Sequence, residues 1–319
     1  MSGNADLTLA IWLCALSAGM TWFLCRLALP VSAAFGVVDH PDERKRHHRP
    51  TPLMGGIVLL AAVLPALVLL FALGPHIWAL HLLVLIGCTA VTALVGIADD
   101  RRHLSARWRL LIAFVLFGAA ALVDPGYYVR LLGFEHPRFD LGLVTTPAAM
   151  VFTTVCLVGL INAVNMADGK NGLVIGLCLG WLGLLALRAP FILQLAIAVI
   201  AASWLVLLSF NLRGKLFLGD GGAYGIATAI GMLAILIYNG PGTHAGRLIS
   251  AEEVMVLFAV PVLDSFRLTI VRLRRGRSPM AADRDHLHHH LQDRLGWPAG
   301  LVAYWLIALI PPLALFLFG

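Results

Sequence analysis

Long apolar stretches separated by short polar connections run through the whole chain. A helix that crosses a membrane needs about 20 apolar residues, and the chain contains ten stretches of this kind, of which the fourth is short. They cover residues 7–29, 53–73, 77–98, 109–123, 144–163, 172–188, 190–209, 222–239, 252–271 and 299–318. The pattern predicts an all-α integral membrane protein, a polytopic bundle of about ten transmembrane helices that forms a single domain over residues 1–319.

The composition agrees with a membrane protein. Hydrophobic residues make up 60% of the chain and charged residues 13%, whereas soluble domains carry about 25% charge. The first apolar stretch is too long for the core of a signal peptide and has no basic segment before it. We therefore expect it to remain as a helix of the mature protein.

The basic residues are divided unevenly between the two sides of the predicted bundle. Connections after odd-numbered spans hold 18 Lys and Arg residues, and the opposite connections hold four. By the positive-inside rule the first set faces the cytoplasm, and ten spans then place both termini outside. The net charge of +6 is thus a topology signal. Nucleic-acid binding is disfavoured because no soluble basic domain is present to carry it.

Acids and histidines gather in the same, cytoplasmic connections. Asp99 and Asp100 end the third span, Asp168 follows the fifth, and Asp220 precedes the eighth. Four histidines lie between the last two spans in "DRDHLHHHLQDR", residues 283–294. Charge near hydrocarbon is costly and is usually functional or paired. The arrangement predicts an active site built from cytoplasmic loops.

Two other classes of membrane protein fit this arrangement less well. A nucleotide-sugar or lipid transporter would place polar groups near the bilayer midplane, whereas the predicted spans are almost free of charge, with Asp264 as the deepest exception. A scaffold without catalytic activity would not need acids or histidines in four loops on one face. We therefore expect an enzyme.

Two of the acidic motifs have spacings that suggest specific chemistry. In "VGIADDRRHL" neighbouring side chains point about 100° apart on a helix, so we expect Asp99 and Asp100 to have different partners, one a reacting group or metal and the other a basic neighbour. In "NAVNMADG" Asn162, Asn165 and Asp168 have i, i+3, i+6 spacing. Such a stripe of oxygen ligands suits Mg²⁺ or a nucleotide, although a helix end and a tight Asn–Gly turn explain the same stretches.

The "FLGDGG" stretch places an acid and two glycines at the start of a predicted helix. Gly221 and Gly222 would let a phosphate approach the backbone N–H groups at the positive end of that helix, and Asp220 could hold the bridging metal. Taken alone, this motif is weak.

Together and in order, four motifs resemble the polyprenyl-phosphate N-acetylhexosamine-1-phosphate transferase family, glycosyltransferase family 4. They are "DD" at 99–100, "NAVNMADGKNGL" at 162–173, "FLGDGG" at 217–222 and "HLHH" at 286–289. The stretch "VRLRRGRSPMAADRDHLHHHL" is similar to the WecA-like branch, which uses UDP-GlcNAc. The peptidoglycan branch, which transfers phospho-MurNAc-pentapeptide, is the alternative.

The resemblance implies an activity and a location. The chain would transfer N-acetylglucosamine-1-phosphate, or a related acetamido-sugar-1-phosphate, from UDP to undecaprenyl phosphate and release UMP. This would be the first membrane step of an envelope polysaccharide such as O-antigen, catalysed at the cytoplasmic face of a bacterial inner membrane. A homodimer is left open. Both a one-step displacement and a two-step route through an aspartyl phosphate fit.

The resemblance also implies roles for individual residues. Asp220 and Asn165 would hold Mg²⁺, or Mn²⁺ in its place, and Asp168 would join the metal or organise it. Asp99, supported by Asp100, would orient the lipid phosphate or take its proton. The substrate-binding residues would be Arg49, Asn162, Asn171, Phe217, Arg101, Arg102, Arg107 and Arg109.

The resemblance also implies a role for the histidines, and Asn171 departs from the family's pattern. His286, His288 and His289 would close the site and donate hydrogen bonds to the pyrophosphate or sugar, and His290 would be a bystander. Zinc is disfavoured because no Cys or further ligand pattern accompanies them. Asn171 departs from the acid usual in the family, so it can bind uracil but cannot ligate a metal as a carboxylate would.

Overall fold

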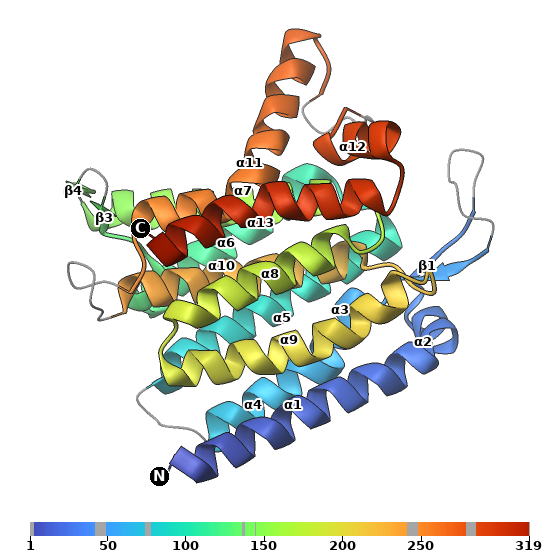
Figure 1. The fold of residues 1–319 in the computed structure, drawn as a ribbon, viewed down its shortest axis with the longest axis horizontal. Coiled ribbons are helices and arrows are strands. Elements are labelled where there is room, and N and C mark those ends of the chain that lie inside the picture. Colours follow the sequence, from blue (N-terminus) through green and yellow to red (C-terminus); the bar gives the residue numbers. More distant parts are fainter. Residues whose placement is uncertain are drawn as a thin grey trace. The chain divides into compact units, whose positions relative to one another are not determined.

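The computed structural model describes residues 3–41, 49–73, 78–135, 138–143, 145–240, 248–278 and 285–318, and most of these are helical (Figure 1). The long apolar helices are α1 (Gly3–Arg26), a continuous helix of α3 (Gly55–Val58), η1 (Leu59–Val63) and α4 (Leu64–Leu73), α5 (Ala79–Arg102), α6 (Ala106–Val123), α7 (Thr146–Ala167), α8 (Leu173–Arg188), α9 (Phe191–Asn211), α10 (Gly219–Asn239), α11 (Ala251–Arg274) and α13 (Ala299–Phe318). The short elements are α2 (Ala28–Phe35), η3 (Pro125–Tyr127), α12 (Leu287–Leu295) and two antiparallel pairs, β1 (Val38–Asp39) with β2 (Thr51–Pro52) and β3 (Leu131–Glu135) with β4 (Arg138–Gly142).

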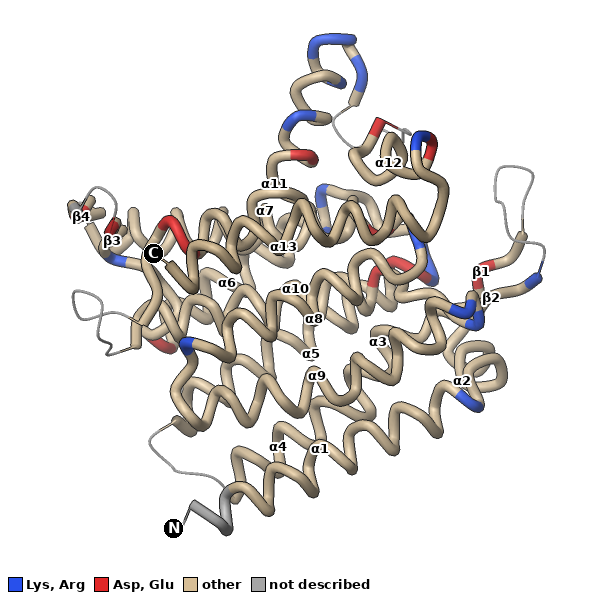
Figure 2. The backbone as a smooth tube through the Cα atoms, viewed as in Figure 1, with Lys and Arg blue, Asp and Glu red and all other residues tan. Residues whose placement is uncertain are grey.

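Every predicted span is a helix, so the polytopic all-α architecture is confirmed. Among the described residues, nine helices are long and apolar enough to cross a membrane, and α8, with 16 residues, is shorter. The fourth span is longer than predicted, since α6 has 18 residues. Charged residues lie mainly at helix ends and in connections (Figure 2). The orientation stays a prediction, and Arg44, Lys45, Arg46, Arg247 and Arg284, which contributed to it, lie outside the described residues.

The chain divides into two compact units, each built from two separate stretches. Unit 1 contains Met1–Leu104 and Pro190–Ala229, and unit 2 contains Ser105–Ala189 and Ile230–Gly319. Helix α10 begins in unit 1 and ends in unit 2. That the whole chain forms one domain stays a prediction.

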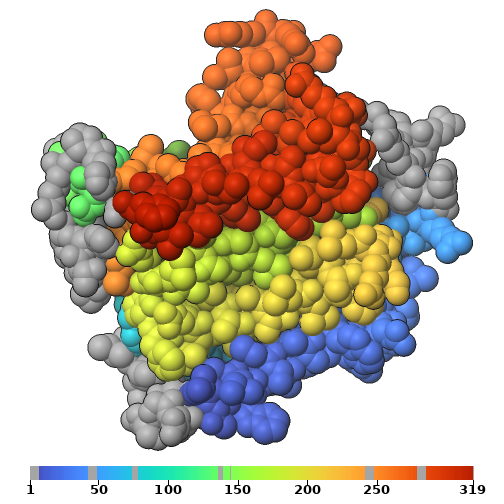
Figure 3. Space-filling view, viewed as in Figure 1, coloured from blue at the N-terminus to red at the C-terminus, as the bar shows by residue number. Residues whose placement is uncertain are grey.

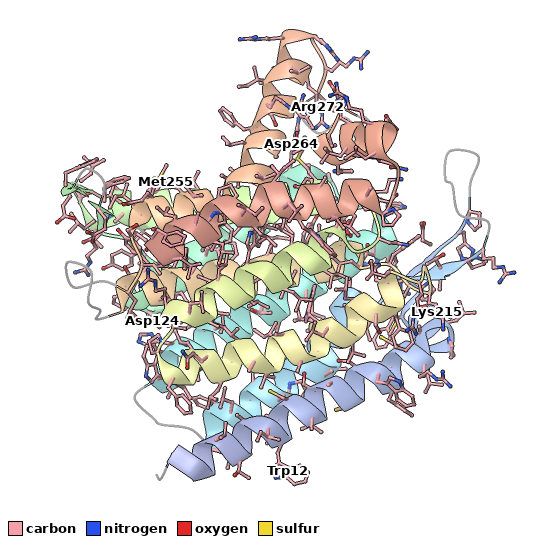
Figure 4. All side chains as sticks on the ribbon, in the orientation of Figure 1. Trp12, Asp124, Lys215, Met255, Asp264 and Arg272 are labelled. Atoms are coloured by element: carbon pink, nitrogen blue, oxygen red, sulfur yellow. The ribbon has the colours of Figure 1, made fainter. Side chains whose placement is uncertain are left out.

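In unit 1, α1 packs along α9, and the two stretches lie side by side on the surface in Figure 3. Small polar side chains join the two helices. The hydroxyl groups of Thr21 and Ser203 are 2.6 Å apart, and Ser17 donates to the carbonyl of Val199 at 3.3 Å. Hydrogen bonds between small polar residues are a common way to join helices in membranes. Large apolar side chains such as Trp12, which is 70% exposed, cover the free side of α1 (Figure 4). This surface suits contact with lipid.

Glycines bring α3 and α5 into backbone contact with the start of α10. A Cβ on Gly96 of α5 would lie 2.4 Å from the carbonyl oxygen of Asp220, and one on Gly55 of α3 would lie 2.4 Å from that of Leu218. Gly221 faces Gly56 in the same way, with a Cβ 3.2 Å from its Cα. Small residues allow such close approach between helices. The packing fixes the backbone that carries Asp220.

In unit 2, α13 packs against α8, α11 and α12, and α7 packs against α6 and α11. The indole of Trp305 on α13 donates to the carbonyl of Leu173 on α8 at 3.1 Å. At the β3–β4 hairpin, the hydroxyl of Tyr238 accepts from the amide of Gly133 and donates to the carbonyl of Leu131, both at 2.7 Å. These contacts join α13 to α8 and the end of α10 to the hairpin.

Candidate active site

In unit 1, Asp100 binds the first turn of α10. Its carboxylate oxygens accept from the backbone amides of Asp220 at 2.9 Å and Gly221 at 3.1 Å. The first amides of a helix have no partner within the helix, so this carboxylate, from the last turn of α5, satisfies two of them. Gly219 has a φ of 73°, and a Cβ there would lie 2.8 Å from Asp100 Oδ2, so this position requires glycine.

This geometry corrects two expectations. The amides of Asp220 and Gly221 were expected to receive a phosphate, but they are occupied by Asp100. Gly221 and Gly222 serve helix packing, since a Cβ on Gly222 would lie 2.8 Å from the Cα of Gly55. The partner of Asp100 is also not the basic neighbour that was expected for one of the two acids, but the end of a helix.

Asp99 has a different partner, as its position on α5 predicted. It is buried and accepts a hydrogen bond from the hydroxyl of Tyr224 on α10 at 3.0 Å. Asp39 of β1 lies close enough to Asp100 to interact with it electrostatically, as does Asp99. Unit 1 thus gathers three carboxylates, Asp39, Asp99 and Asp100, and Asp100 binds the backbone of Asp220.

The "TPLMGG" stretch, residues 51–56, is joined to the "FLGD" stretch by backbone hydrogen bonds within unit 1. The amide of Phe217 donates to the carbonyl of Pro52 at 2.9 Å, and the carbonyl of Phe217 accepts from Met54 at 3.0 Å. The Phe217 side chain remains half-buried. The sequence stretches "TPLMGG" and "FLGDGG", far apart in the chain, therefore form one structural element that carries Phe217 and Asp220.

The predicted arginines lie at the ends of helices and in loops. Arg49, Arg101 and Arg102 of unit 1 are exposed. In unit 2, Arg107 is exposed and Arg109 is half-buried in the first turns of α6. Arg101 lies over the turn at Gly36, where a Cβ would be 3.1 Å from its Nε. Substrate binding by these arginines stays a prediction.

In unit 2, the amide and acid stripe of α7 has the predicted geometry. Asn162, Asn165 and Asp168 are all half-buried, and residues 163, 164 and 167 between them are buried. The side-chain amide of Asn162 donates to the carbonyl of Val158 at 2.7 Å, one turn earlier. Asp168 ends the helix, and the half-buried Asn171 lies in the turn that leads to α8. The stripe therefore presents oxygen atoms at the end of α7.

The histidine motif forms the start of α12 and is not uniform. His286 precedes the helix, and its Nδ1 lies 3.0 Å from Oδ2 of Asp264 on α11. His288 is buried against the turn after α7, since a Cβ on Gly169 would lie 2.5 Å from its Nε2. His289 is half-buried, and His290 is exposed and pairs with Asp285 at 2.9 Å. The three motif histidines thus lie in three different surroundings, and their hydrogen bonds to the pyrophosphate or sugar stay a prediction.

His288 is neutral at physiological pH. Its ring nitrogens are both buried, and neither has a hydrogen-bond partner among the described residues. This burial, together with the nearby His289 and His286, lowers the pKa of His288 to about 3 from its ordinary 6.5. The lowered pKa favours the neutral ring, and the side chain packs against the turn at Gly169.

A pH dependence of stability follows from the buried His288. Between about pH 6.5 and pH 3 the unfolded chain binds a proton at this residue that the folded protein does not bind. Stability should fall as the pH is lowered through this window. We expect the unfolding temperature of His288→Gln to depend less steeply on pH between 7 and 5 than that of the wild type. The exposed His290→Gln is the control, and equal slopes in all three proteins would contradict the assignment.

The described candidates for metal ligands are oxygen atoms of Asp and Asn side chains. No three His, Cys, Asp or Glu side chains there are grouped so that they could hold an ion by themselves. The carboxylates of unit 1 and the amide oxygens of the α7 stripe are hard ligands of the kind that Mg²⁺ prefers. In unit 1, Asp220 is half-buried at the start of α10 and offers oxygen atoms of this kind, and its role as a Mg²⁺ ligand stays a prediction.

Tyr224 and Asp264 bind predicted site residues, but the sequence did not assign either of them to the site. Tyr224 binds Asp99, and its position one helical turn after Asp220 is a signal that could have identified it. Asp264 was noted only as the deepest acid in a predicted span. Its isolation in an apolar helix, behind Pro261, was the available signal.

Comparison with known proteins agrees with the order of the motifs. Residues 82–238 match the family model described as "Glycosyl transferase family 4". An undecaprenyl-phosphate alpha-N-acetylglucosaminyl 1-phosphate transferase of Yersinia pestis is 32% identical over 275 residues, which cover 82% of this chain and 71% of the relative. The protein of that name from Escherichia coli K12 is 30% identical over 271 residues, and a probable undecaprenyl-phosphate N-acetylglucosaminyl 1-phosphate transferase of Bacillus subtilis is 30% identical over 270, both with the same coverage.

Proposed function

Because the chain belongs to glycosyl transferase family 4, we propose that it transfers N-acetylglucosamine-1-phosphate from UDP-GlcNAc to undecaprenyl phosphate and releases UMP. Relatives with this activity in their names cover most of the chain at about 30% identity. The observation that carries the proposal is the arrangement at α10, where Asp100 holds the backbone of Asp220 and Tyr224 holds Asp99. An acid of the "DD" pair thereby positions the acid of "FLGDGG".

The proposed reaction joins two anions, and the chain's residues have distinct tasks in it. An oxygen of the lipid phosphate attacks the β-phosphorus of the donor, and the bond from this phosphorus to the oxygen of UMP breaks. Asp99, held by Tyr224, orients the attacking phosphate or takes its proton. Arg49, Arg101 and Arg102 lower the repulsion between the two substrates. Phe217 and Asn171 correspond to family residues implied in uracil binding, and we propose the same role for each of them here.

As the family resemblance implies, Asp220 and Asn165 would hold Mg²⁺, and Asp168 would join the ion or organise it. The bound ion supplies positive charge that neutralises the pyrophosphate and makes phosphorus more electrophilic. Asp100 keeps Asp220 in place through the backbone rather than by binding substrate. Asn162 donates to its own helix and so stabilises the stripe that carries Asn165.

The membrane setting fits a lipid acceptor. The chain is a multi-pass membrane protein of a bacterial enzyme family. We propose that it lies in the inner membrane with Asp99, Asp168, Asp220 and the histidines facing the cytoplasm, where UDP-sugars are found. The excess of Lys and Arg in the connections of that side supports this orientation.

A comparison of donors tests the proposal. Purified protein with Mg²⁺ and undecaprenyl phosphate should form a sugar-labelled lipid from UDP-GlcNAc and release UMP. UDP-MurNAc-pentapeptide should give no lipid product under the same conditions. Product from the pentapeptide donor alone would move the chain to the peptidoglycan branch, and movement of intact UDP-GlcNAc across vesicles without product would indicate a transporter.

A further inference from the structure

We propose that Asp264 is a positioning residue that fixes both the ring of His286 and the first turn of α12. The carboxylate accepts at Oδ2 from His286 Nδ1 at 3.0 Å. It also accepts from the backbone amide of Leu287, with distances of 3.3 Å to Oδ1 and 3.2 Å to Oδ2. One side chain of α11 thus holds two consecutive residues at the start of another helix.

The start of α12 depends on an acceptor from elsewhere. The first amides of a helix lack intrahelical partners, and His286, which occupies the N-cap position, makes no side-chain cap hydrogen bond. Asp264 supplies the missing acceptor for Leu287 and places a negative charge at the positive end of the helix. Without it, the amide of Leu287 would lose this partner, and the first turn of α12 would open more often.

Arg267 restrains the carboxylate and the loop before α12. Its guanidinium donates to Oδ1 of Asp264 at 2.9 Å and to the backbone carbonyl of Asp285. In Figure 4, Asp264 lies where α11 changes direction between Met255 and Arg272, and Pro261 lies in this part of the helix. Proline removes a helical hydrogen bond and favours such a bend. The bend carries Asp264 to the start of α12.

The contact has a consequence for the chemistry of His286. Because Nδ1 is bound to the carboxylate, Nε2 is the nitrogen with which this ring can bind a substrate. A partner that holds one ring nitrogen of a histidine also fixes the direction in which the other nitrogen points. The rings of His286 and His288 lie stacked with centroids 5.3 Å apart. Asp264 therefore orients the ring of His286 relative to that of His288.

Simple packing does not account for an acid at this position. The side chains of His286 and Asp264 are only 10% and 9% exposed. Burying a carboxylate costs desolvation free energy, and apolar residues of similar volume often stabilise a helix contact as well or better. We therefore infer that the pair is retained for orientation. The expected effect of Asp264 on turnover rests on the proposed function. Its expected effect on the first turn of α12 does not.

A double-mutant cycle with a structural readout tests this assignment. Asp264→Ala, Asp264→Asn, His286→Ala and the Asp264→Ala/His286→Ala protein are compared with the wild type. We measure kcat and KM for UDP-GlcNAc, and hydrogen exchange of the peptide that contains Leu287. Asp264→Leu, which also lacks acceptors, replaces Asp264→Ala if that variant does not fold.

The expected results separate positioning from general destabilisation. Asp264→Ala should lower kcat by roughly 10- to 100-fold with little change in KM, and the double variant should be no slower than His286→Ala, because Asp264 acts through His286. Asp264→Asn, which keeps an acceptor, should recover most of the rate. The Leu287 peptide should exchange faster in Asp264→Ala and in the double variant, which both lack the carboxylate, and not in Asp264→Asn or His286→Ala. Variants of the exposed Asp285 and His290 pair, Asp285→Asn and His290→Ala, are the matched controls and should behave as wild type.

Two outcomes would overturn the inference. One is that the losses in kcat caused by Asp264→Ala and by His286→Ala multiply in the double variant, as expected for two residues that act independently. The other is unchanged exchange of the Leu287 peptide in Asp264→Ala. If the wild type forms no lipid product, the proposed function fails, and the exchange measurement still decides whether Asp264 holds α12.

Discussion

Replacing Asp220 with asparagine should lower kcat by about 1000-fold while the protein remains folded. Asparagine has nearly the same size, and its backbone amide can still donate to Asp100, so the start of α10 should be unchanged. The lost negative charge weakens Mg²⁺ binding, and so we also expect a higher Mg²⁺ concentration for half-maximal rate. Activity across a Mg²⁺ titration and thermal unfolding measure the two effects.

The control for this substitution is Asp140→Asn, the same change at an exposed residue of β4. It should leave both the rate and the Mg²⁺ requirement unchanged. If Asp220→Asn retains the wild-type rate at every Mg²⁺ concentration, Asp220 is not a ligand of the ion.

The second large effect is expected from Gly96→Ala in α5. The added Cβ would lie 2.4 Å from the carbonyl oxygen and 2.5 Å from the carbonyl carbon of Asp220. These are backbone atoms, so no side-chain rotation relieves the overlap and α5 must move away from α10. We expect a loss of about 3 kcal/mol or more in stability. In any protein that folds, we also expect a fall in kcat, since the displaced backbone carries Asp220.

Gly87→Ala in the same helix is the matched control for the packing prediction. A Cβ on Gly87 meets nothing within 4 Å, and alanine favours helix more than glycine does. Its unfolding temperature and activity should therefore equal or exceed those of the wild type. If Gly96→Ala behaves like Gly87→Ala in detergent-purified protein, the close contact between α5 and α10 is wrong.

The spans could be predicted from the sequence because hydrophobic length alone determines them in a membrane. Even so, 109–123 was placed too short, since α6 begins at Ala106 and its first turn includes Arg107 and Arg109. These charged residues ended the apolar stretch while the backbone continued as helix. Element ends depend on local hydrogen bonds that hydropathy does not report.

The acids of unit 1 and the polar stripe and histidines of unit 2 could also be predicted from the sequence, but their partners could not. Adjacent acids on α5 were expected to have different partners, and they do. Which partners they have depends on how α10 packs, and that is set by glycines at positions 96 and 221. The "GDGG" stretch fits both a phosphate loop and a helix contact, and only the tertiary structure distinguishes them. The same is true of His288, whose burial against Gly169 no local pattern indicates.

The central claim is that the chain transfers a sugar phosphate and not a sugar, and a doubly labelled donor tests it most directly. UDP-GlcNAc carries ³²P at the β-phosphate and ³H in the sugar, and is incubated with purified protein, Mg²⁺ and undecaprenyl phosphate. We predict that both labels enter the lipid in the ratio present in the donor and that the released nucleotide is unlabelled UMP. Transfer of ³H alone, with ³²P left in UDP, or no labelled lipid at all, would contradict the account.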